Sequence, residues 1–224
     1  MIKRPGMPHV DDPRLSFDPA QLDATIARAK IQIRKRMKAL RAGHGGRALA
    51  ERSRKIVERV LSLPEFDAAG SVALFWPMVE RGEVDLRPLD AVLRERGKQV
   101  FYPFMRPLGE GRFQTGFAVT HTLDELVPST QGFLQPSSQS SARPGAIDLV
   151  LVPALAADAR GHRIGYGAGY YDSTLGDVRP PAKAWIVAYH FQLMAELPVE
   201  RHDQACDGII TDDVTLPVDP PSAA

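Results

Sequence analysis

Two apolar patterns with the period of a helix open the chain. In the first, which runs to Gly43, apolar residues recur at spacings of seven, four and three: Ile26, Ile33, Met37 and Leu40. The Asp18-Pro19 pair marks its start, because Asp is a favoured helix cap and Pro fits the first helical turn. The glycines at 43, 45 and 46 end it, and a second helix is expected over residues 47–63. Its buried side is predicted to carry Leu49, Ile56, Val60 and Leu63.

Beyond residue 70 the pattern changes to short continuous apolar runs, which predict buried strands. These runs span residues 71–76, 98–102, 147–152, 184–188 and 208–211, the last strand expected. The first three stop at Pro77, Pro103 and Pro153, and residues 111–119 predict an edge strand. A helix over 86–96 separates the first two strands, and such alternation favours a parallel sheet with right-handed crossovers. Residues 128–146 are dense in Ser, Gln, Pro and Gly and predict a surface loop.

The expected fold is therefore α/β: a three-layer sandwich around a mostly parallel sheet, with two N-terminal helices. We expect a single domain over residues 20–216, because 224 residues can form one large domain with its own core. Residues 1–19 are rich in Pro and charge and predict a disordered N-terminal arm, and residues 217–224 predict a disordered tail.

Composition narrows the class of protein. The 28 Lys and Arg residues against 27 Asp and Glu leave a net charge of +1, which removes the bulk electrostatic argument for a nucleic-acid binder. No stretch approaches the ~18 apolar residues of a membrane-spanning helix. Cys206 is the only cysteine, which excludes an intrachain disulfide framework and a multi-cysteine zinc site and favours a reducing, cytoplasmic compartment. No helix carries a second apolar stripe for an interface, so we expect a monomer.

The segment after residues 147–152, the run expected to form the central strand, concentrates the candidate chemistry. Its candidate groups are four glycines, two arginines, the adjacent tyrosine pair and the acid that follows it: Gly161, Gly165, Gly167, Gly169, Arg160, Arg163, Tyr170, Tyr171 and Asp172. Parallel sheets bind ligands at the carboxyl ends of their strands. The glycine-loop N–H groups, a helix starting near Gly169 and the arginines favour a phosphate ligand. Asp172 can hold a magnesium ion that bridges phosphates.

Neither of the two simplest phosphate signatures matches this segment. No Gly-Lys-Ser/Thr occurs in the chain, and Tyr170 stands where GxGxxG requires its third glycine. A glycine-rich surface turn is the alternative. The adjacent tyrosines disfavour that alternative, because their rings can stack on a flat ligand.

The run GHRIGYGAGYYDSTL resembles the signature of the 5-formyltetrahydrofolate cyclo-ligase family, also called methenyltetrahydrofolate synthetases, whose pattern is G-x-R-[LI]-G-x-G-x-G-Y-Y-D. The resemblance extends from about residue 29 to residue 212. At its start, the segment from Lys30 to Arg34 resembles K-x-x-[LI]-R, and near its end Pro198 to Asp203 resembles P-x-E-x-x-D. Between them, Gly82 to Asp85 resembles the family's acidic E-[VI]-D/E segment.

The resemblance implies a Rossmann-like fold of the cyclo-ligase type. It also implies the ATP-dependent conversion of 5-formyltetrahydrofolate to 5,10-methenyltetrahydrofolate, with release of ADP and phosphate. The implied cofactor is Mg²⁺, with ATP as co-substrate. In this reaction the formyl oxygen is phosphorylated and the N10 nitrogen then attacks the activated carbon. Such phosphoryl transfer depends mainly on alignment and charge neutralisation.

The same resemblance assigns roles to particular residues. Catalysis falls to Arg163, Tyr170 and Asp172, and magnesium binding to Asp172 and Asp203. The residues assigned to ATP are Lys30, Arg34, Arg163, Ile164, Gly165, Tyr166, Gly167, Ala168, Gly169, Tyr170 and Tyr171. Those assigned to the folate are Trp76, Glu83, Tyr166, Gly167, Ala168, Gly169 and Tyr170.

Physical reasoning supports these placements and leaves an alternative beside each. Lys30 and Arg34 lie four apart, so they share a helix face and can reach one phosphate chain; a solvated basic face is the alternative. Glu83 follows a strand end and can accept two adjacent N–H groups of a pterin; the alternative is a plain loop acid. Trp76 is either a core residue or a wall of the folate pocket. Asp203 is either a metal ligand or a helix cap or loop acid.

Three positions depart from the family pattern. Ala168 stands where Gly or Lys is usual, Ser173 where Arg is frequent, and Gln135 where an acid is expected. Two other functions stay open. One is a kinase-like enzyme or transferase that uses the same loop for another nucleotide or sugar phosphate, which would not need Trp76 and Glu83. The other is a folate or nucleotide sensor without catalysis.

Overall fold

The structure, a computed structural model, describes residues 18–218. Its α-helices are α1 (Pro19–Gly43), α2 (Gly46–Leu61), α3 (Pro64–Ala68), α4 (Arg87–Glu95) and α5 (Tyr170–Val178). Short 3₁₀ turns follow at η2 (Val79–Arg81), η3 (Leu123–Glu125) and η4 (His190–Gln192). The predicted disordered arm and tail fall mainly on residues 1–17 and 219–224, which lie outside the described residues.

The strands form three sheets. The main sheet has seven strands in the order β12-β11-β9-β6-β1-β2-β3. Their bounds are β1 (Ser71–Ala73), β2 (Gln99–Gly109), β3 (Arg112–Val119), β6 (Leu149–Pro153), β9 (Lys183–Val187), β11 (Gly208–Ile210) and β12 (Thr215–Pro217). A three-stranded sheet has the order β10-β7-β8, from β7 (Ala156–Asp158), β8 (Arg163–Ile164) and β10 (Leu193–Met194), and β4 (Leu126–Pro128) pairs with β5 (Leu134–Pro136).

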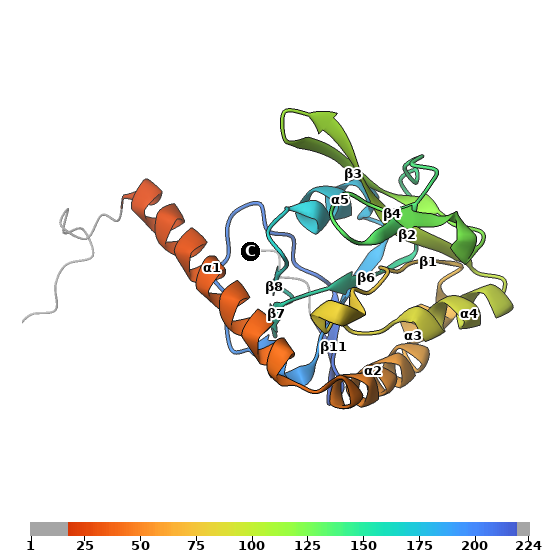
Figure 1. The fold of residues 1–224 in the computed structure, drawn as a ribbon, viewed down its shortest axis with the longest axis horizontal. Helices are drawn as coiled ribbons and strands as arrows, with labels where there is room; N and C mark the ends of the chain where they lie inside the picture. The colour runs from red at the N-terminus through yellow and green to blue at the C-terminus, as the bar shows by residue number, and fades with distance from the viewer. Residues whose placement is uncertain (1–17, 219–224) are drawn as a thin grey trace, which may run out of the picture.

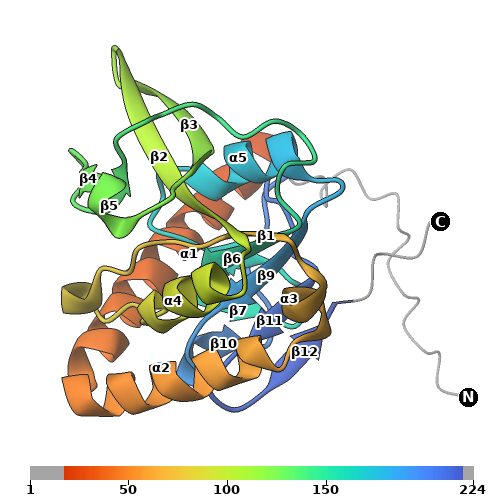
Figure 2. The ribbon, with the colours of Figure 1, turned by 90° about the vertical axis from the view of Figure 1, so that its right-hand side faces the viewer.

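The main sheet is parallel from β11 to β2, and antiparallel strands β12 and β3 close its two edges. Side chains of a strand alternate between faces, so on β6 Leu149 and Leu151 join one core cluster and Val150 and Val152 join the other. The first cluster packs against α2, α3 and α4, and the second against α5. Figure 1 and Figure 2 show these helices on opposite sides of the strands. The predicted three-layer α/β fold is confirmed.

Helix α1 covers neither face of the main sheet. In Figure 1 it runs diagonally beside β7 and β8, and Met37 packs there with Leu155, Ala156 and Ile164. Asp18 caps its first turn through a 3.0 Å bond from the Ala20 N–H, as the Asp-Pro pair predicts. The predicted apolar stripe is only partly right, because Leu40 is exposed and the buried residues of α1 are Lys30, Met37 and Arg41.

Helix α2 follows the prediction closely. All of its expected core positions are buried: Leu49, Ile56, Val60 and, just beyond its end, Leu63. The short helix α3 follows at Pro64 and was not predicted. Among the described residues no helix is long and apolar enough to cross a membrane.

Pro103 does not end its strand as predicted. The Leu74 N–H donates to the Phe101 carbonyl, and the Met105 N–H donates to the Gln135 side chain over 2.9 Å. The backbone N–H and C=O groups of the odd-numbered residues of β2 therefore point away from β3, toward the side where β1 lies. On that side β1 has already ended at Ala73. The N–H that Pro103 lacks would have had no partner strand there, which is the position where a sheet accepts proline.

Two other strand predictions are corrected. The strand at 208–211 is not the last, because β12 returns antiparallel to β11. The segment 128–146 is not only a surface loop, since β5 lies within it and Gln135 is buried. The polar composition of this segment hid the short strand. β5 is held by pairing with β4 and by the hydrogen bond from the Met105 N–H to Gln135, and these interactions need no apolar run in the sequence.

The sheet also contains one close approach that tests the packing. Gly208 pairs with Trp185 across β11 and β9, and a Cβ at Gly208 would lie 2.5 Å from the indole ring. We expect Gly208→Ala to lower the free energy of unfolding by about 1–3 kcal/mol through overpacking, measured by urea unfolding. The control is Gly176→Ala in α5, where a Cβ meets nothing within 4 Å and helix propensity predicts a gain of about 0.5–1 kcal/mol. Equal stability of the two variants would contradict the packing described here.

Candidate functional site

One pocket of about 350 Å³ opens at the carboxyl edge of the main sheet. Phe75 and Trp76 follow β1 into its wall, and Ala154 follows β6. The glycine-rich segment and α1 close the pocket from the other side. Open parallel sheets bind ligands at this edge, in the crevice outside the carboxyl ends of their strands.

Every residue assigned to a site from the sequence lines this pocket. They are Lys30, Arg34, Trp76, Glu83, Arg163, Ile164, Gly165, Tyr166, Gly167, Ala168, Gly169, Tyr170, Tyr171, Asp172 and Asp203. The chain brings them together from α1, the loop after β1, the segment β8–α5 and the segment after β10. Arg160 does not join them: it is exposed and pairs with Glu196 over 2.7 Å.

The glycine segment forms a loop that leads into α5. Gly167 has φ +105° and Gly169 caps α5 with φ +67°, conformations that side-chain-bearing residues rarely adopt. The Arg34 guanidinium lies against this loop, because its Nε donates to the Gly165 carbonyl over 3.0 Å and a Cβ at Gly167 would lie 3.3 Å from Arg34 Cζ. The free N–H groups at the start of α5 and the cation of Arg34 make this loop suited to an anion.

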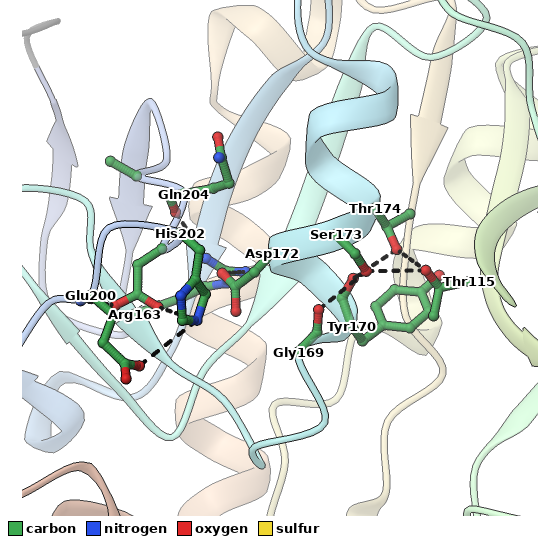
Figure 3. A network of polar contacts seen from close by, with 12 residues as sticks. Thr115, Arg163, Gly169, Tyr170, Asp172, Ser173, Thr174, Glu200, His202 and Gln204 are labelled. Carbon is green, nitrogen blue, oxygen red and sulfur yellow. Dashed lines mark hydrogen bonds and ion pairs between the residues drawn. The ribbon is translucent and has the colours of Figure 1, made fainter. Parts of the chain in front are cut away.

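Arg163 holds the same segment through Asp172, as Figure 3 shows. Its side chain is only 4% exposed, and its guanidinium donates to Asp172 Oδ1 and to the Gln204 carbonyl, each over 2.9 Å. Its Cζ lies 5.7 Å from the centre of the Tyr171 ring. Asp172 therefore sits in the first turn of α5 with a fixed cationic partner.

Tyr170 is held on the opposite side of α5. Its hydroxyl donates to the Gly116 carbonyl over 2.5 Å, and burial raises its pKa well above the ordinary 10.0. Its ring packs edge-on against Phe117 and Tyr171. The hydroxyl hydrogen is thus committed to the β3 backbone, so Tyr170 contributes a rigid wall to the pocket in this structure rather than a free proton donor.

Lys30 joins α1 to the segment after β10. Its side chain is 7% exposed, and its Nζ lies 2.6 Å from both Glu200 Oε2 and Asp203 Oδ2. Burial by itself lowers the pKa of Lys30, but hydrogen bonds to Asp203 and Glu200 and the charges of both raise it above 10.5. The solvated basic face that was the alternative for Lys30 is ruled out by this burial.

The donor set around Asp203 has the chemistry that magnesium prefers. Ligand atoms of Glu200, His202 and Asp203 lie within 4.8 Å of one another, and carboxylate oxygens are suitable hard ligands. Asp172 lines the same pocket but is not part of this cluster. In the described part of the chain these acids bind the cations Lys30 and Arg163 directly. The carboxylates of Glu200 and Asp203 therefore fit a divalent cation, and Asp172 lies outside their cluster in the lining of the same pocket.

Glu83 and Trp76 form the acidic and aromatic side of the pocket. Glu83 is buried, and one carboxylate oxygen accepts from the Met78 N–H over 2.8 Å. Burial raises the pKa of Glu83, while the Met78 N–H, Arg41, Tyr166 and Arg81 counter the rise. Trp76 is half-buried, lines the pocket and packs against the core, and its role toward a folate stays a prediction.

Sequence reasoning assigned no role to Arg41. It is buried, and it lies near Glu83 and Tyr166 without lining the pocket itself. The missed signal is a spacing of four, three and four residues along Lys30, Arg34, Met37 and Arg41. This spacing places all three basic residues on the helix face that carries Met37. The rim residues Arg81, Gln131 and Phe133 were also missed.

The three departures from the family pattern have different settings. Ala168 is exposed and lines the pocket. Ser173 is not among the pocket residues, and its hydroxyl donates to the Tyr170 carbonyl over 2.9 Å. Gln135 uses its side-chain oxygen to accept from the Met105 backbone, a bond that a carboxylate oxygen also makes.

The fold and the pocket define a class. This is an α/β protein whose ligand site lies at the carboxyl edge of a mostly parallel sheet, with a glycine loop and cations on one side and a buried acid with aromatic rings on the other.

Comparison with known proteins narrows that class. The model of the 5-formyltetrahydrofolate cyclo-ligase family matches residues 26–212. The 5-formyltetrahydrofolate cyclo-ligase of Escherichia coli is 29% identical over 72% of this chain and 88% of its own, and that of Mycolicibacterium smegmatis is 32% identical over 66% and 70%. A solved structure of Aquifex aeolicus 5,10-methenyltetrahydrofolate synthetase superposes with a TM-score of 0.72 at 28% identity, over 87% of this chain and 95% of that one. The chain belongs to the 5-formyltetrahydrofolate cyclo-ligase family, and it is an enzyme of the cyclo-ligase class.

The Lys30–Asp203 pair makes stability depend on pH. Burial raises the pKa of Asp203, but the hydrogen bonds from Lys30 and the Glu200 N–H and the charge of Lys30 lower it below 3.8 overall. Its contribution to stability is present above pH 3.8 and is lost as the pH falls through the lowered value. We expect Asp203→Asn to lower the free energy of unfolding by about 1–3 kcal/mol at neutral pH, with the difference from wild type shrinking in acid.

The measurement is urea unfolding in EDTA across the acid range. Glu196→Gln is the matched control, because Glu196 is 65% exposed in its pair with Arg160 and such pairs contribute little. A stability difference for Asp203→Asn that stays constant as the pH is lowered would contradict the ion pair described here.

Proposed function

We propose that this enzyme converts 5-formyltetrahydrofolate to 5,10-methenyltetrahydrofolate with ATP, releasing ADP and phosphate. The observation that carries the proposal is one pocket with two chemically different sides. The loop from Gly165 to Gly169 with Arg34 and Arg163 is suited to a phosphate chain, and Glu83 with Trp76 is suited to a flat ring bearing N–H donors. The two sides open on one space, as group transfer between two bound substrates requires.

On the nucleotide side the proposed contacts are electrostatic. The N–H groups at the start of α5 bind the phosphate oxygens, and Lys30 and Arg34 from α1 neutralise them. Arg163 acts through a fixed position, because Asp172 and the Gln204 carbonyl already hold its guanidinium. The proposal also gives the backbone from Ile164 to Tyr171 to ATP, since this segment lines the pocket continuously.

On the folate side Glu83 is the proposed recognition group. Pterins present adjacent N–H donors, and a carboxylate can accept two of them at once. Trp76, Tyr166 and the ring of Tyr170 form the flat walls. Burial favours this role, because a hydrogen bond to a carboxylate away from water is stronger than one at the surface.

The reaction solves a leaving-group problem. The formamide oxygen attacks the γ-phosphorus as the bond to ADP breaks, which turns a poor leaving group into a phosphate ester. The N10 nitrogen then uses its electron pair to bond the formyl carbon, loses its proton, and the carbon–oxygen bond breaks to release phosphate. The chain's residues hold the two substrates in line and neutralise charge, and no side-chain nucleophile is needed.

We also propose that Asp172 and Asp203 hold Mg²⁺ together with ATP. Bound there, the ion would supply charge neutralisation between the phosphate oxygens. Lys30, which now binds Asp203, would then turn part of its charge toward the nucleotide.

The proposed partners are the two small molecules alone. The expectations of a monomer and of a cytoplasmic location stay predictions. The transferase alternative is disfavoured because Glu83 and Trp76 lie in the same pocket as the glycine loop, where an enzyme without a folate would not need them. A sensor would bind ATP and 5-formyltetrahydrofolate but form no methenyltetrahydrofolate, and this result would distinguish it from the proposed enzyme.

The test is a spectrophotometric assay of the full chain with 5-formyltetrahydrofolate. We expect methenyltetrahydrofolate to form only when ATP and Mg²⁺ are both present, with one ADP and one phosphate released per product. ATP hydrolysis that is indifferent to the folate, or no turnover at all, would contradict the proposed function.

Asp172→Asn tests the metal-binding role. The amide oxygen still accepts from Arg163, so the fold is preserved while the negative charge is lost. We expect turnover to fall by about 10²-fold or more, while thermal unfolding stays cooperative and shows that the variant is folded. Asp177→Asn is the control, because Asp177 is exposed on the same helix; an Asp172→Asn enzyme as active as this control would remove Asp172 from the magnesium site.

A further inference from the structure

A buried arginine connects the walls of the pocket without lining it. Arg41, in the last turn of α1, is 3% exposed. Its Nη2 donates to the Ala154 carbonyl over 2.6 Å, and its Nη1 lies 3.1 Å from the Tyr166 hydroxyl oxygen. Ala154 follows β6 and Tyr166 belongs to the glycine loop, so one guanidinium joins α1 to two parts of the pocket wall.

The same arginine touches the loop that carries Glu83. A Cβ at Gly82 would lie 3.5 Å from Arg41 Cβ and 3.9 Å from its Cδ, so the backbone next to Glu83 packs on the arginine stem. The positive charge of Arg41 lowers the pKa of Glu83, against the larger effect of burial. Within residues 18–218 no ion pair within 4.0 Å includes Arg41, and its Nε is buried without a partner. A buried cation with so few partners is costly to maintain, which points to a specific role.

The direction of the hydrogen bonds defines that role. Arg has donors and no acceptor, so the Tyr166 oxygen accepts from Arg41 and its hydrogen is free to point elsewhere. Glu83 and Tyr166 line the same pocket. The Tyr166 hydroxyl lowers the pKa of Glu83, and burial first and the charge of Glu83 second raise the pKa of Tyr166 to about 12. The hydrogen that Arg41 leaves free on Tyr166 is therefore expected to point to Glu83.

We propose that Arg41 is a positioning residue for the folate substrate, which aligns the Tyr166 hydroxyl and keeps Glu83 available as a carboxylate. This inference rests on the proposed function, in which Glu83 binds the donor edge of the pterin. Arg41 acts through these two residues and through the Ala154 carbonyl, and it touches neither substrate. Lysine cannot replace it fully, because only the guanidinium fork reaches two acceptors at once.

The side chains that act on Glu83 come from four segments. They are Arg41 of α1, Arg81 of η2, Tyr166 of the glycine loop and Tyr171 of α5. Removing the charge of Arg41 leaves Arg81 as the remaining cation, and Arg81 is about half exposed. The pKa of Glu83 should then rise further, so that Glu83 is protonated, and folate binding is lost, at a higher pH than in the wild type.

The experiment compares Arg41→Met, Arg41→Lys and the control Arg36→Met, which removes a charge from the exposed face of the same helix. For Arg41→Met we expect the KM for 5-formyltetrahydrofolate to rise about tenfold or more, with the KM for ATP within about twofold of wild type. The acid limb of kcat/KM for the folate should move to higher pH. Arg41→Lys should raise this KM but leave the acid limb in place, and Arg36→Met should match the wild type.

A readout independent of turnover is the titration of the Glu83 carboxyl by NMR. Its pKa should be higher in Arg41→Met than in Arg41→Lys or Arg36→Met. Should Arg41→Met fail to fold, Tyr166→Phe combined with Arg41→Lys in a double-mutant cycle replaces it, and the two effects on folate KM should be non-additive. Equal pH limbs and an equal Glu83 pKa in all variants, or an additive cycle, would overturn the inference.

The outcome also separates this inference from the proposed function. A wild-type enzyme that makes no product rejects the proposed function, while the Glu83 titration still decides whether Arg41 controls that carboxyl. An active wild type whose Arg41 variants behave like Arg36→Met rejects only the positioning role.

Discussion

The inner face of α1 buries positive charge, and this constraint organises the pocket. Lys30 and Arg41 are each about 95% removed from solvent, where an unpartnered cation is unfavourable. Each must find acceptors, and these come from segments far away in the chain: Glu200 and Asp203 for Lys30, and Ala154 and Tyr166 for Arg41. Arg34 between them holds the Gly165 carbonyl. A helix that covers neither face of the main sheet is thereby fixed over its carboxyl edge, and the pocket is closed.

The charges divide the pocket into two halves that favour different ligands. Around the glycine loop every acid already has a cation, as Asp172 has Arg163, so that half keeps an excess of donors. In the other half Glu83 has no ion pair within 4.0 Å among the described residues, and it accepts from the Met78 N–H. An acceptor-rich corner beside a donor-rich loop is a consistent arrangement for a pterin and a phosphate chain. Tyr166 and Tyr170 also line the pocket, and their hydroxyls are held by Arg41 and by the Gly116 carbonyl.

Local sequence features predicted much of this. The spacing of apolar residues predicted α2 and its core positions correctly, and the runs at 71–76, 147–152 and 184–188 predicted strands β1, β6 and β9, of which only β6 was expected at the centre of the sheet. These predictions hold because continuous apolar runs and a 3.6-residue period follow from burial on two faces or on one stripe. The residues assigned through the family resemblance, from the glycine segment and from other parts of the chain, all line one pocket in the structure. Two local predictions were wrong. Pro103 does not end its strand, because β1 has no residue there that would need its N–H. Leu40 was expected on the buried side of α1 but is exposed.

The sequence alone determined the layered α/β architecture, the family and the identity of the groups around the pocket, because periodicity, strand ends and the run from Gly161 to Asp172 are properties of neighbouring residues. Only the tertiary structure decided how the charges are used. It showed that Lys30 and Arg41 are buried, that Arg160 is paired at the surface, and that the Tyr170 hydroxyl is committed to Gly116. The reason is that the identity of a charged residue does not show whether its side chain is solvated or buried against a partner. Its partners lie more than a hundred residues away for Lys30 and Arg41, and no local pattern encodes such a pairing.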